Sequence, residues 1–307
     1  MNLFITGSQG FIGRHLKKFL KKFLSYNLFT PSSSQLNLLN EKDVDDYILA
    51  NNIDIIIHLA NHGGARDTSD IKNIPEYNLR MFFNIAKQAP RVERIIHLGS
   101  GAEYGKHKPI IEAREEDALR AMPLDDYGFY KSVCSRYIEK SDNMVNLRIF
   151  GCYGEGENYR YKFISNTIVK NLLHLPITIN QNVYFDYIYI DDLIRMIEHF
   201  IHNKPQHKVY NVTRGEKVSL LKLAETINRV SDFRSEIKII NDGLNNEYTS
   251  ANKRVMQELG NFQFTSHEDA IKKMREYFSY NIHNLDQESI LKDPYFGKID
   301  QIWKKEA

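Results

Sequence analysis

Cysteine and long apolar runs are scarce in this 307-residue sequence, and charge of one sign hardly exceeds the other. Two cysteines, Cys134 and Cys152, are too few for a disulfide framework, and no Cys-x-x-Cys pair indicates zinc. No stretch is apolar for the roughly 18 residues that a membrane-spanning helix needs, and no charged-then-apolar leader follows Met1. The net charge of +2 gives no reason to expect nucleic acid. By elimination we expect a cytoplasmic enzyme or binding protein with no membrane or nucleic-acid partner.

Short apolar runs alternate with amphipathic segments through the first half of the chain. Because parallel strands need helical crossovers, this alternation predicts an α/β fold, a Rossmann-type doubly wound parallel sheet, over residues 1–150. The expected strands are Asn2–Thr6, Tyr26–Thr30, Ile53–Ala60, Arg94–Ser100 and Val145–Phe150, and the expected helices are 11–24, Glu41–Asn52, 75–89 and 127–140.

The rhythm loosens after Phe150, where Gly151–Tyr161 has the composition of a loop. The later segments predict a smaller C-terminal α+β substrate domain made of 151–182 and 213–280, with 183–212 returning to the large domain. The expected helices are 162–174, 219–230 and 266–278, and the expected strands are Val183–Leu193, Lys208–Val212 and Glu236–Ile240. Asp191 and Asp192 would end the first of these strands and cap the next helix. Residues 281–307, which contain Trp303, form a tail of unknown role.

Three glycines, Gly7, Gly10 and Gly13, leave the first expected strand and open the first expected helix. In that position the first glycine permits a tight turn, the second lets a pyrophosphate approach the backbone, and the third lets helix and strand pack closely. The N–H groups at the helix N-terminus attract the anion. The loop therefore predicts a dinucleotide site, although glycines that serve only a turn are the alternative.

The choice of dinucleotide depends on a missing acid. An NAD site usually carries Asp or Glu about 20 residues after the loop, but no acidic residue lies between Gly13 and Glu41. Thr30–Gln35 offers hydroxyls instead, and Arg14 offers a guanidinium for a 2′-phosphate. NADP is favoured and NAD remains possible, with Ser32–Ser34 then a plain loop. The residues expected along the cofactor here are Gly7, Ser8, Gln9, Gly10, Phe11, Ile12, Gly13, Arg14, Ser32, Asn37 and Leu38.

Tyr127 and Lys131 lie four residues apart at the start of an expected helix and hence on one face. An ammonium near a phenol favours the phenolate and brings its proton transfers into a useful range. Ser100 ends the fourth expected strand, at the edge where α/β sheets bind ligands. These three residues are candidates for an acid–base centre; a surface pair and a turn serine are the alternatives.

At this point the sequence resembles the extended short-chain dehydrogenase/reductases that act on nucleotide-sugars. The resemblance runs from Asn2 to about residue 278 and rests on FITGSQGFIG, DIIIHLA, NLRMFFNIA, HLGSGAEYG, YGFYKS, LRIFGCYG, FDYIYIDDL, YNVTRGEKVSLLKLAE and NKRVMQELG. It implies that Tyr127 is the acid/base, that Lys131 lowers its pKa and holds the nicotinamide ribose, and that Ser100 binds the sugar oxygen. It also implies a homodimer through paired helices of the large domain, one of them the Tyr127 helix. It places five residues around the cofactor: Leu59, Ala60, Leu98, Asn78 and Phe150. At the nucleotide diphosphate of the substrate it places Arg160, Lys162 and Asn166, with Arg254 as a weaker candidate.

Departures from the family pattern narrow the reaction. Dehydratases of the family carry Asp and Glu after the triad threonine, and fucose-synthase-like members carry a cysteine where Gly101 stands; here Ser100 is followed by Gly101 and Ala102. Glu103 stands where an apolar residue is usual. We therefore predict NADPH-dependent reduction of a nucleotide-linked 4-keto-6-deoxy sugar. The alternatives are a 4-epimerase with tightly bound NAD and, from another class, a non-catalytic dinucleotide-binding redox sensor.

Two further groups of residues suggest metal ligands only superficially. His58 and His62 are four apart, but the first lies in an expected strand, where helical ligand spacing does not apply. Asp186, Asp191 and Asp192 flank an expected strand and cap. We expect structural roles for all of them and no metal site.

Overall fold

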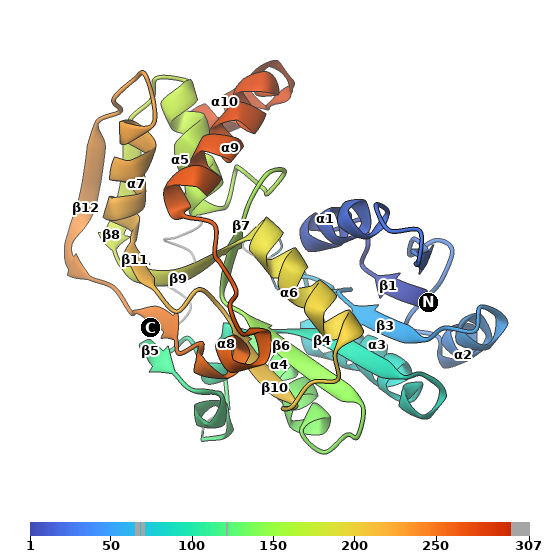
Figure 1. Ribbon diagram of the computed structural model, residues 1–307. Helices are drawn as coiled ribbons and strands as arrows, with labels where there is room; N and C mark the ends of the chain where they lie inside the picture. Colours follow the sequence, from blue (N-terminus) through green and yellow to red (C-terminus); the bar gives the residue numbers. More distant parts are fainter. Residues whose placement is uncertain (65–67, 69–70, 121, 296–307) are drawn as a thin grey trace.

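Figure 1 shows the computed structural model of the protein, which describes residues 1–64, 68, 71–120 and 122–295. Trp303 and the end of the predicted tail lie outside the described residues. The chain forms a larger part around a parallel sheet and a smaller part built mainly from later segments (Figure 1). Among the described residues no helix is both long and apolar enough to cross a membrane.

The larger part is a six-stranded parallel sheet in the order β10-β6-β4-β3-β1-β2. Helix α1 packs against α6, while α3 packs against both α2 and α4. The strands that follow β1 in the chain lie on opposite sides of it, β2 on one side and β3 on the other. This arrangement creates a topological switch point at the carboxyl ends of β1 and β3. The elements are β1 Asn2–Thr6, α1 Phe11–Leu20, β2 Asn27–Phe29, α2 Glu41–Ala50, β3 Ile55–His58, α3 Ile74–Ala86, β4 Arg94–Ser100, α4 Asp126–Ile138, β6 Met144–Ile149, α6 Ile190–His202 and β10 Val209–Val212.

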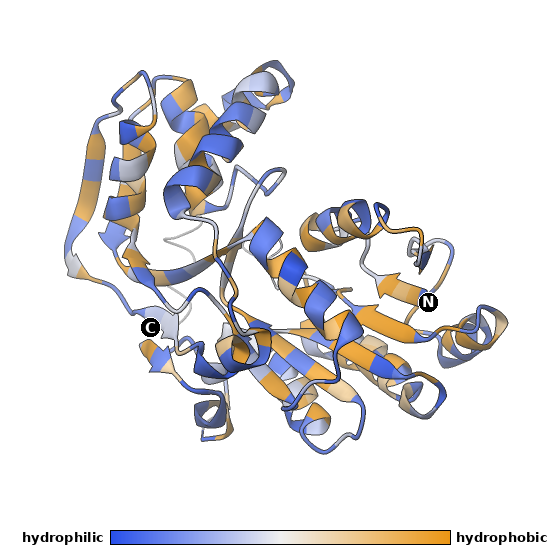
Figure 2. Cartoon of the chain, viewed as in Figure 1, coloured by the Kyte–Doolittle hydropathy of each residue, from blue (hydrophilic) through white to orange (hydrophobic). Residues whose placement is uncertain are grey.

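The central strands are buried on both faces, which explains their continuous apolar sequences. Every residue of β3, IIIH, and of β4, RIIHLGS, is buried. Figure 2 shows β1 and β3 as almost wholly hydrophobic. Leu3 and Ile5 face a core that contains α1 and α6, whereas Phe4 faces the core formed with α2, α3 and α4. The doubly wound fold predicted from the alternation is therefore confirmed.

The smaller part contains a five-stranded sheet in which β11, β9, β13 and β5 are neighbours and β7 also pairs with β9. A two-stranded sheet of β8 and β12 lies beside the helices α5 and α7, on which α9 packs (Figure 1). Within 183–212, α6 and β10 belong to the larger part, while β9 belongs to this sheet. The elements are β5 Ile110–Ala113, β7 Gly151–Tyr153, α5 Phe163–Leu172, β8 Ile177–Asn182, β9 Tyr184–Tyr189, β11 Lys217–Ser219, α7 Leu220–Arg229, β12 Ile237–Leu244, β13 Tyr248–Ser250, α8 Lys253–Leu259, α9 His267–Tyr280 and α10 Gln287–Leu291.

Two expectations about this part are wrong. The strand predicted to reach Leu193 ends at Tyr189, and Asp191 and Asp192 lie in the first turn of α6 rather than at a cap. The reason is that α6 already begins at Ile190, the first buried residue of its apolar face, and acidic side chains in a first turn interact favourably with the helix dipole. The supposed loop Gly151–Tyr161 begins with β7, which is only three residues long and therefore too short to show a period.

Candidate active site

The glycine loop occupies the switch point between β1 and β3. Gly7 has φ +64°, and a Cβ there would lie 2.7 Å from Ala60 N; a Cβ on Gly13 would lie 2.7 Å from Ser8 Cα. Both glycines are therefore required by the packing of the loop. At Gly10, in contrast, a Cβ would meet only the Gly7 carbonyl oxygen, at 3.3 Å, so the space in front of this backbone is open.

The N-terminus of α1 opens directly onto that space. Gly10 is its N-cap and supplies no side chain, and the first turn holds no acidic residue. Phe11 and Ile12 begin the helix, and their N–H groups belong to the set that a helix leaves unpaired. These features fit the pyrophosphate of a dinucleotide.

The two side chains predicted to favour NADP over NAD, those of Arg14 and Ser32, lie in separate places. Arg14 donates to the carbonyl oxygens of Gln9, at 3.1 Å, and Gly156, at 3.3 Å. The Ser32 hydroxyl, beyond β2, instead contacts the Ser34 hydroxyl at 2.8 Å. The remaining predicted positions make backbone or turn contacts: Ser8 Oγ donates to Thr30 O at 3.5 Å, Asn37 Oδ1 accepts from Leu39 N at 3.1 Å, and Leu38 O accepts from Asn84 Nδ2 at 2.8 Å.

The carboxyl end of β3 is fixed by a threonine from β1. Thr6 Oγ1 accepts the N–H groups of Leu59 and Ala60, each at 3.1 Å. It is also 2.9 Å from His58 Nδ1, so the first histidine of the pair has a structural partner. The side chain of Asn78 is buried and holds the second, His62, accepting from its N–H at 2.9 Å and donating to its carbonyl oxygen at 2.8 Å. Within the described residues no three His, Cys, Asp or Glu side chains cluster in a way that could hold a metal.

Tyr127 and Ser100 meet at the carboxyl edge of β4. Asp125 caps α4 by accepting the Gly128 N–H at 2.8 Å, so the tyrosine lies in the first turn of the helix. The Tyr127 phenol lies close enough to the Ser100 side chain for that side chain to influence its pKa. On the other side its ring lies so close to Gly64 that a Cβ at that glycine would clash with the ring. The phenol and the serine hydroxyl can therefore act on one oxygen atom of a ligand.

Lys131 lies on the same face of α4, but the expected lowering of the Tyr127 pKa is not what the structure shows. Burial raises the pKa of Tyr127 to about 12, and the Ser100 side chain acts in the opposite direction. The Lys131 ammonium donates to the Leu98 carbonyl oxygen and lies 5.9 Å from the centre of the Tyr127 ring. Burial also lowers the pKa of Lys131. Burial is therefore the largest influence on the Tyr127 pKa in this arrangement.

A fully buried ion pair underlies Ser100. Glu103 Oε1 accepts the Ser100 N–H at 3.0 Å, and its carboxylate pairs with Arg148, neither side chain having any exposed surface. Asn146 Nδ2 donates to the same carboxylate at 3.2 and 3.3 Å. A Cβ at Gly99 would collide with both Asn146 and Glu103. The acidic residue that departs from the family pattern thus fixes the turn after Ser100.

The site contains two residues that the sequence did not reveal. The Ser100 side chain also influences the pKa of Tyr248 of β13, whose ring centre lies 4.8 Å from that of Phe150. The Lys106 ammonium lies 5.7 Å from the centre of the Tyr127 ring and 5.6 Å from that of Tyr248. Because β13 has only three residues, no period marks it, and no motif links it to Ser100.

The residues predicted to bind the nucleotide diphosphate are not all brought together. Asn166 of α5 is buried, and its Nδ2 atom has no hydrogen-bond partner among the described residues. Lys162 is the exposed N-cap residue of the same helix, and the Arg160 guanidinium lies 3.6 Å from Asp286. Arg254 instead lies on α8, where it donates to Val209 O at 3.1 Å. The carboxylates of Glu115 and Glu116 are 3.9 and 3.6 Å from its guanidinium.

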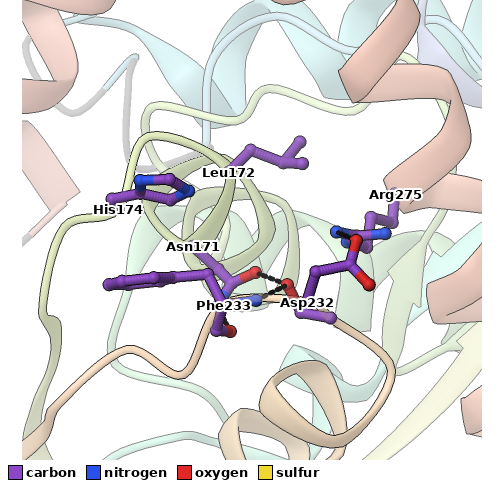
Figure 3. A pocket seen from close by; sticks show the side chains of 7 residues that line it. Asn171, Leu172, His174, Asp232, Phe233 and Arg275 are labelled. Carbon is purple, nitrogen blue, oxygen red and sulfur yellow. Dashed lines mark hydrogen bonds and ion pairs between the residues drawn. The ribbon is translucent and has the colours of Figure 1, made fainter.

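A surface pocket of the smaller part is separate from this site. It lies between α5, α9 and the segment after α7, where the His174 ring stacks on Phe233 with ring centres 4.2 Å apart (Figure 3). Arg275 Nη2 is 3.1 Å from the exposed carboxylate of Asp232. The pocket shares no lining residue with the glycine loop or with Ser100, Tyr127 and Lys131. The predicted chemistry therefore belongs to the sheet edge rather than to this pocket.

Asp186 and Asp192 also have structural partners. Asp186 accepts the backbone N–H groups of Arg214, at 3.1 Å, and Gly215, at 3.0 Å. Asp192 accepts the N–H and the hydroxyl of Thr265, both at 2.9 Å. Each carboxylate fixes a loop.

Comparison with known proteins identifies the family of the chain. Residues 3–213 match the NAD dependent epimerase/dehydratase family. The chain belongs to this family. It is an NAD(P)-dependent enzyme of the oxidoreductase and epimerase class, as the resemblance implied.

Curated relatives of the family include both reductases and epimerases. The chain is 30% identical over 241 residues to dTDP-4-dehydro-6-deoxyglucose reductase from Escherichia coli, covering 71% of this chain and 73% of the relative. It is 25% identical to ADP-L-glycero-D-manno-heptose-6-epimerase from Brachyspira hyodysenteriae, covering 84% and 90%. A solved GDP-L-fucose synthetase from Naegleria fowleri bound to NADP has the same fold, with a TM-score of 0.80, 17% identity and coverage of 92% and 93%.

Proposed function

We propose that this protein is an NADPH-dependent reductase that converts a nucleotide-linked 4-keto-6-deoxy sugar to the 4-hydroxy sugar. The observation that carries the proposal is the packing at Gly101, next to Ser100. A Cβ at this position would lie 2.5 Å from the Tyr248 hydroxyl and 2.8 Å from the Phe150 ring. An acid or a thiol for proton abstraction at a neighbouring carbon therefore does not fit there, while the groups needed for carbonyl reduction are present.

Each residue of the site has a separate role in the proposed reaction. NADPH would supply the hydride that adds to C4, held by the glycine loop and α1. Tyr127 donates its proton to the C4 oxygen as that oxygen takes up the electron pair of the carbonyl bond, and Ser100 donates a hydrogen bond to the same oxygen. The resulting tyrosinate regains a proton from water. Lys131 would hold the ribose of the dinucleotide and stabilise the tyrosinate, and Phe150 would border the nicotinamide.

In this proposal the smaller part binds the phosphates of the substrate. The unpartnered Nδ2 of Asn166 supports this role, since a buried donor without an acceptor is costly and a phosphate oxygen would satisfy it. Lys162 and Arg160 add positive charge at the start of α5. Arg254 is the weakest member of the set, because it already has two carboxylate neighbours. This proposal makes 1–150, with α6 and β10, the dinucleotide domain, and 151–182 with β9 and 213–280 the substrate domain.

The test is to mix the purified protein with several nucleoside diphosphate 4-keto-6-deoxyhexoses and follow NADPH absorbance. We expect one mole of NADPH consumed per mole of 4-hydroxy product, and no consumption by Tyr127→Phe. Exposed Tyr280 on α9 offers the matched control, Tyr280→Phe, which should match the wild type. Interconversion of 4-epimers with no added dinucleotide would instead identify the 4-epimerase. Dinucleotide binding without any turnover would favour the redox sensor.

A further inference from the structure

The Tyr127 ring has two close neighbours, one on its own helix and one on the segment that follows β3. On α4 the Tyr130 ring meets it at a right angle, with ring centres 5.4 Å apart. In the other segment, residues 61–64, the Gly64 backbone has φ +83°, and a Cβ there would lie 2.2 Å from Tyr127 Cδ2. Only a glycine fits against the ring at this point. The position of segment 61–64 therefore decides how far the ring can move.

The Asn61 side chain joins these two neighbours. Its Oδ1 atom accepts the Tyr130 hydroxyl, and its Nδ2 atom donates to the carbonyl oxygen of Gly63, the residue before Gly64. The partners fix the orientation of the amide, because a carbonyl oxygen can only accept and must therefore face the NH₂ group. The Oδ1 atom then faces a hydroxyl that can donate to it. One side chain thus connects α4 to the backbone that packs on the Tyr127 ring.

The same segment is attached to α3 by a different residue. Asn78 accepts the His62 N–H at 2.9 Å and donates to the His62 carbonyl oxygen at 2.8 Å. It also donates to the Ile74 carbonyl oxygen at 2.8 Å, within α3 itself. These bonds position the segment relative to α3, whereas Tyr127 lies on α4. The hydrogen bond made by Asn61 relates the segment directly to the helix that carries the tyrosine.

We propose that Asn61 is a positioning residue, which keeps Gly64 against the Tyr127 ring and so holds the phenol hydroxyl at the C4 oxygen of the substrate. The proposal rests on the proposed function and extends it to a side chain that neither gives nor takes the transferred proton. Proton donation requires the hydroxyl to lie within hydrogen-bond reach of the receiving oxygen. A displacement of about 1 Å can cost about 10²-fold in rate, so a ring that is free to move should slow the reaction.

The test begins with Asn61→Ala, which removes both hydrogen bonds. We expect kcat to fall about tenfold while KM for the keto sugar changes by less than about twofold, because the substrate contacts remain. Tyr130→Phe, which keeps the ring and removes only the hydroxyl, should also lower kcat. The matched control is Asn203→Ala after α6, where the exposed side chain donates to the His199 carbonyl oxygen at 3.0 Å; it should keep the wild-type kcat. A wild-type kcat in Asn61→Ala would overturn the proposal.

A double-mutant cycle and single-turnover kinetics separate positioning from a merely structural role. If both variants break one link, the double variant should be no slower than Asn61→Ala alone, and fully additive losses would contradict the proposal. Protein loaded with one equivalent of NADPH is then mixed with saturating keto sugar. Asn61→Ala should oxidise all of the bound NADPH, with a lower rate constant. A wild-type rate constant with a smaller amplitude would show only a loss of folded protein and would reject the positioning role.

Failure of the proposed function is distinguishable from failure of this link. Should the wild type reduce no keto sugar, the proposed function fails by itself. Denaturant unfolding of the wild type, the two single variants and the double variant then measures the link. Coupled changes in the unfolding midpoint would support the connection between Asn61 and Tyr130, and additive changes would reject it.

Discussion

The Glu103 carboxylate and the Arg148 guanidinium form an ion pair with no exposed surface, directly behind Ser100. Arg148 also donates to the Glu115 carbonyl oxygen and to Ser135 Oγ, both at 2.8 Å. Glu103 Oε1 accepts from Ser100 N at 3.0 Å and from Asn146 Nδ2 at 3.2 Å, so each end of the pair is further hydrogen-bonded. The pair therefore ties the turn after β4 to β6 and α4. The backbone of Ser100 is therefore held in place by a buried, hydrogen-bonded ion pair.

Breaking this pair should destabilise the protein strongly. Glu103→Gln leaves the Arg148 charge buried without a counter-charge, which typically costs about 3–5 kcal/mol of unfolding free energy. Denaturant unfolding measures the loss. The control is Glu116→Gln, whose side chain is about half exposed and should cost less than about 1 kcal/mol. A loss below about 1 kcal/mol for Glu103→Gln would show that the pair does not support the fold.

The pH dependence of reduction tests the environment of Tyr127. The phenol must be protonated to donate, and burial raises its pKa to about 12, so it stays protonated at every pH well below that value. We expect kcat/KM for reduction to show no decline from loss of this proton between about pH 7 and pH 10. A decline with its midpoint below about pH 9 that is absent in Lys131→Met would show instead that Lys131 lowers the pKa of Tyr127 in the working enzyme.

The large sheet and the acid–base centre differ in how far the sequence could predict them. The four residues of β3 are buried on both faces, so their apolar run identifies a parallel strand directly. The spacing of Tyr127 and Lys131 correctly places them on one helical face. It cannot show that the lysine nitrogen turns to Leu98 O, because that contact joins elements far apart in the chain. Tyr248 escapes prediction for the same reason, since three residues of β13 carry no pattern.

Glu157 should make the stability of the protein depend on pH. Burial raises its pKa from 4.5 to about 7, partly offset by Lys162 and by the hydroxyl of Ser165. Because the folded state then binds the proton more tightly than the unfolded state, this contribution is complete below about pH 4.5 and is lost as the pH rises through 7. Between pH 4.5 and 8 the wild type should lose up to about 3 kcal/mol relative to Glu157→Gln.

Unfolding of the two proteins by denaturant at several pH values provides this measurement. Gln keeps an acceptor for the Ser165 hydroxyl, which lies 2.6 Å from the carboxylate, so only the titration is removed. Glu225→Gln, an exposed change on α7, is the control and should keep the wild-type pH profile. Parallel profiles for the wild type and Glu157→Gln would refute the role of this carboxyl group.

Arg14 should set the preference between the two dinucleotides. No carboxylate follows the glycine loop to repel a 2′-phosphate, and Arg14 reaches the loop through the Gln9 carbonyl oxygen. We expect NADPH to bind more tightly than NADH, and Arg14→Ala to reduce that ratio about tenfold or more, the worth of a charged hydrogen bond. Titration by protein fluorescence measures both affinities, with exposed Lys18→Ala on the same helix as control. Equal affinities in the wild type would overturn the assignment to NADP.

The outer faces of α3 and α4 should form a homodimer interface. Phe83 and Tyr137 pack edge to face with ring centres 5.3 Å apart, and Tyr137 remains 43% exposed while Phe129 on α4 is 37% exposed. Partly exposed aromatic side chains on adjacent helices are typical of an interface between subunits. Sedimentation velocity should show a dimer for the wild type and a monomer for Tyr137→Glu, because a buried unpaired carboxylate opposes association. The control is Tyr280→Glu on α9, where the side chain is 88% exposed, and this variant should remain dimeric. A Tyr137→Glu variant that still dimerises would place the interface elsewhere. A monomeric wild type would show that there is no such interface.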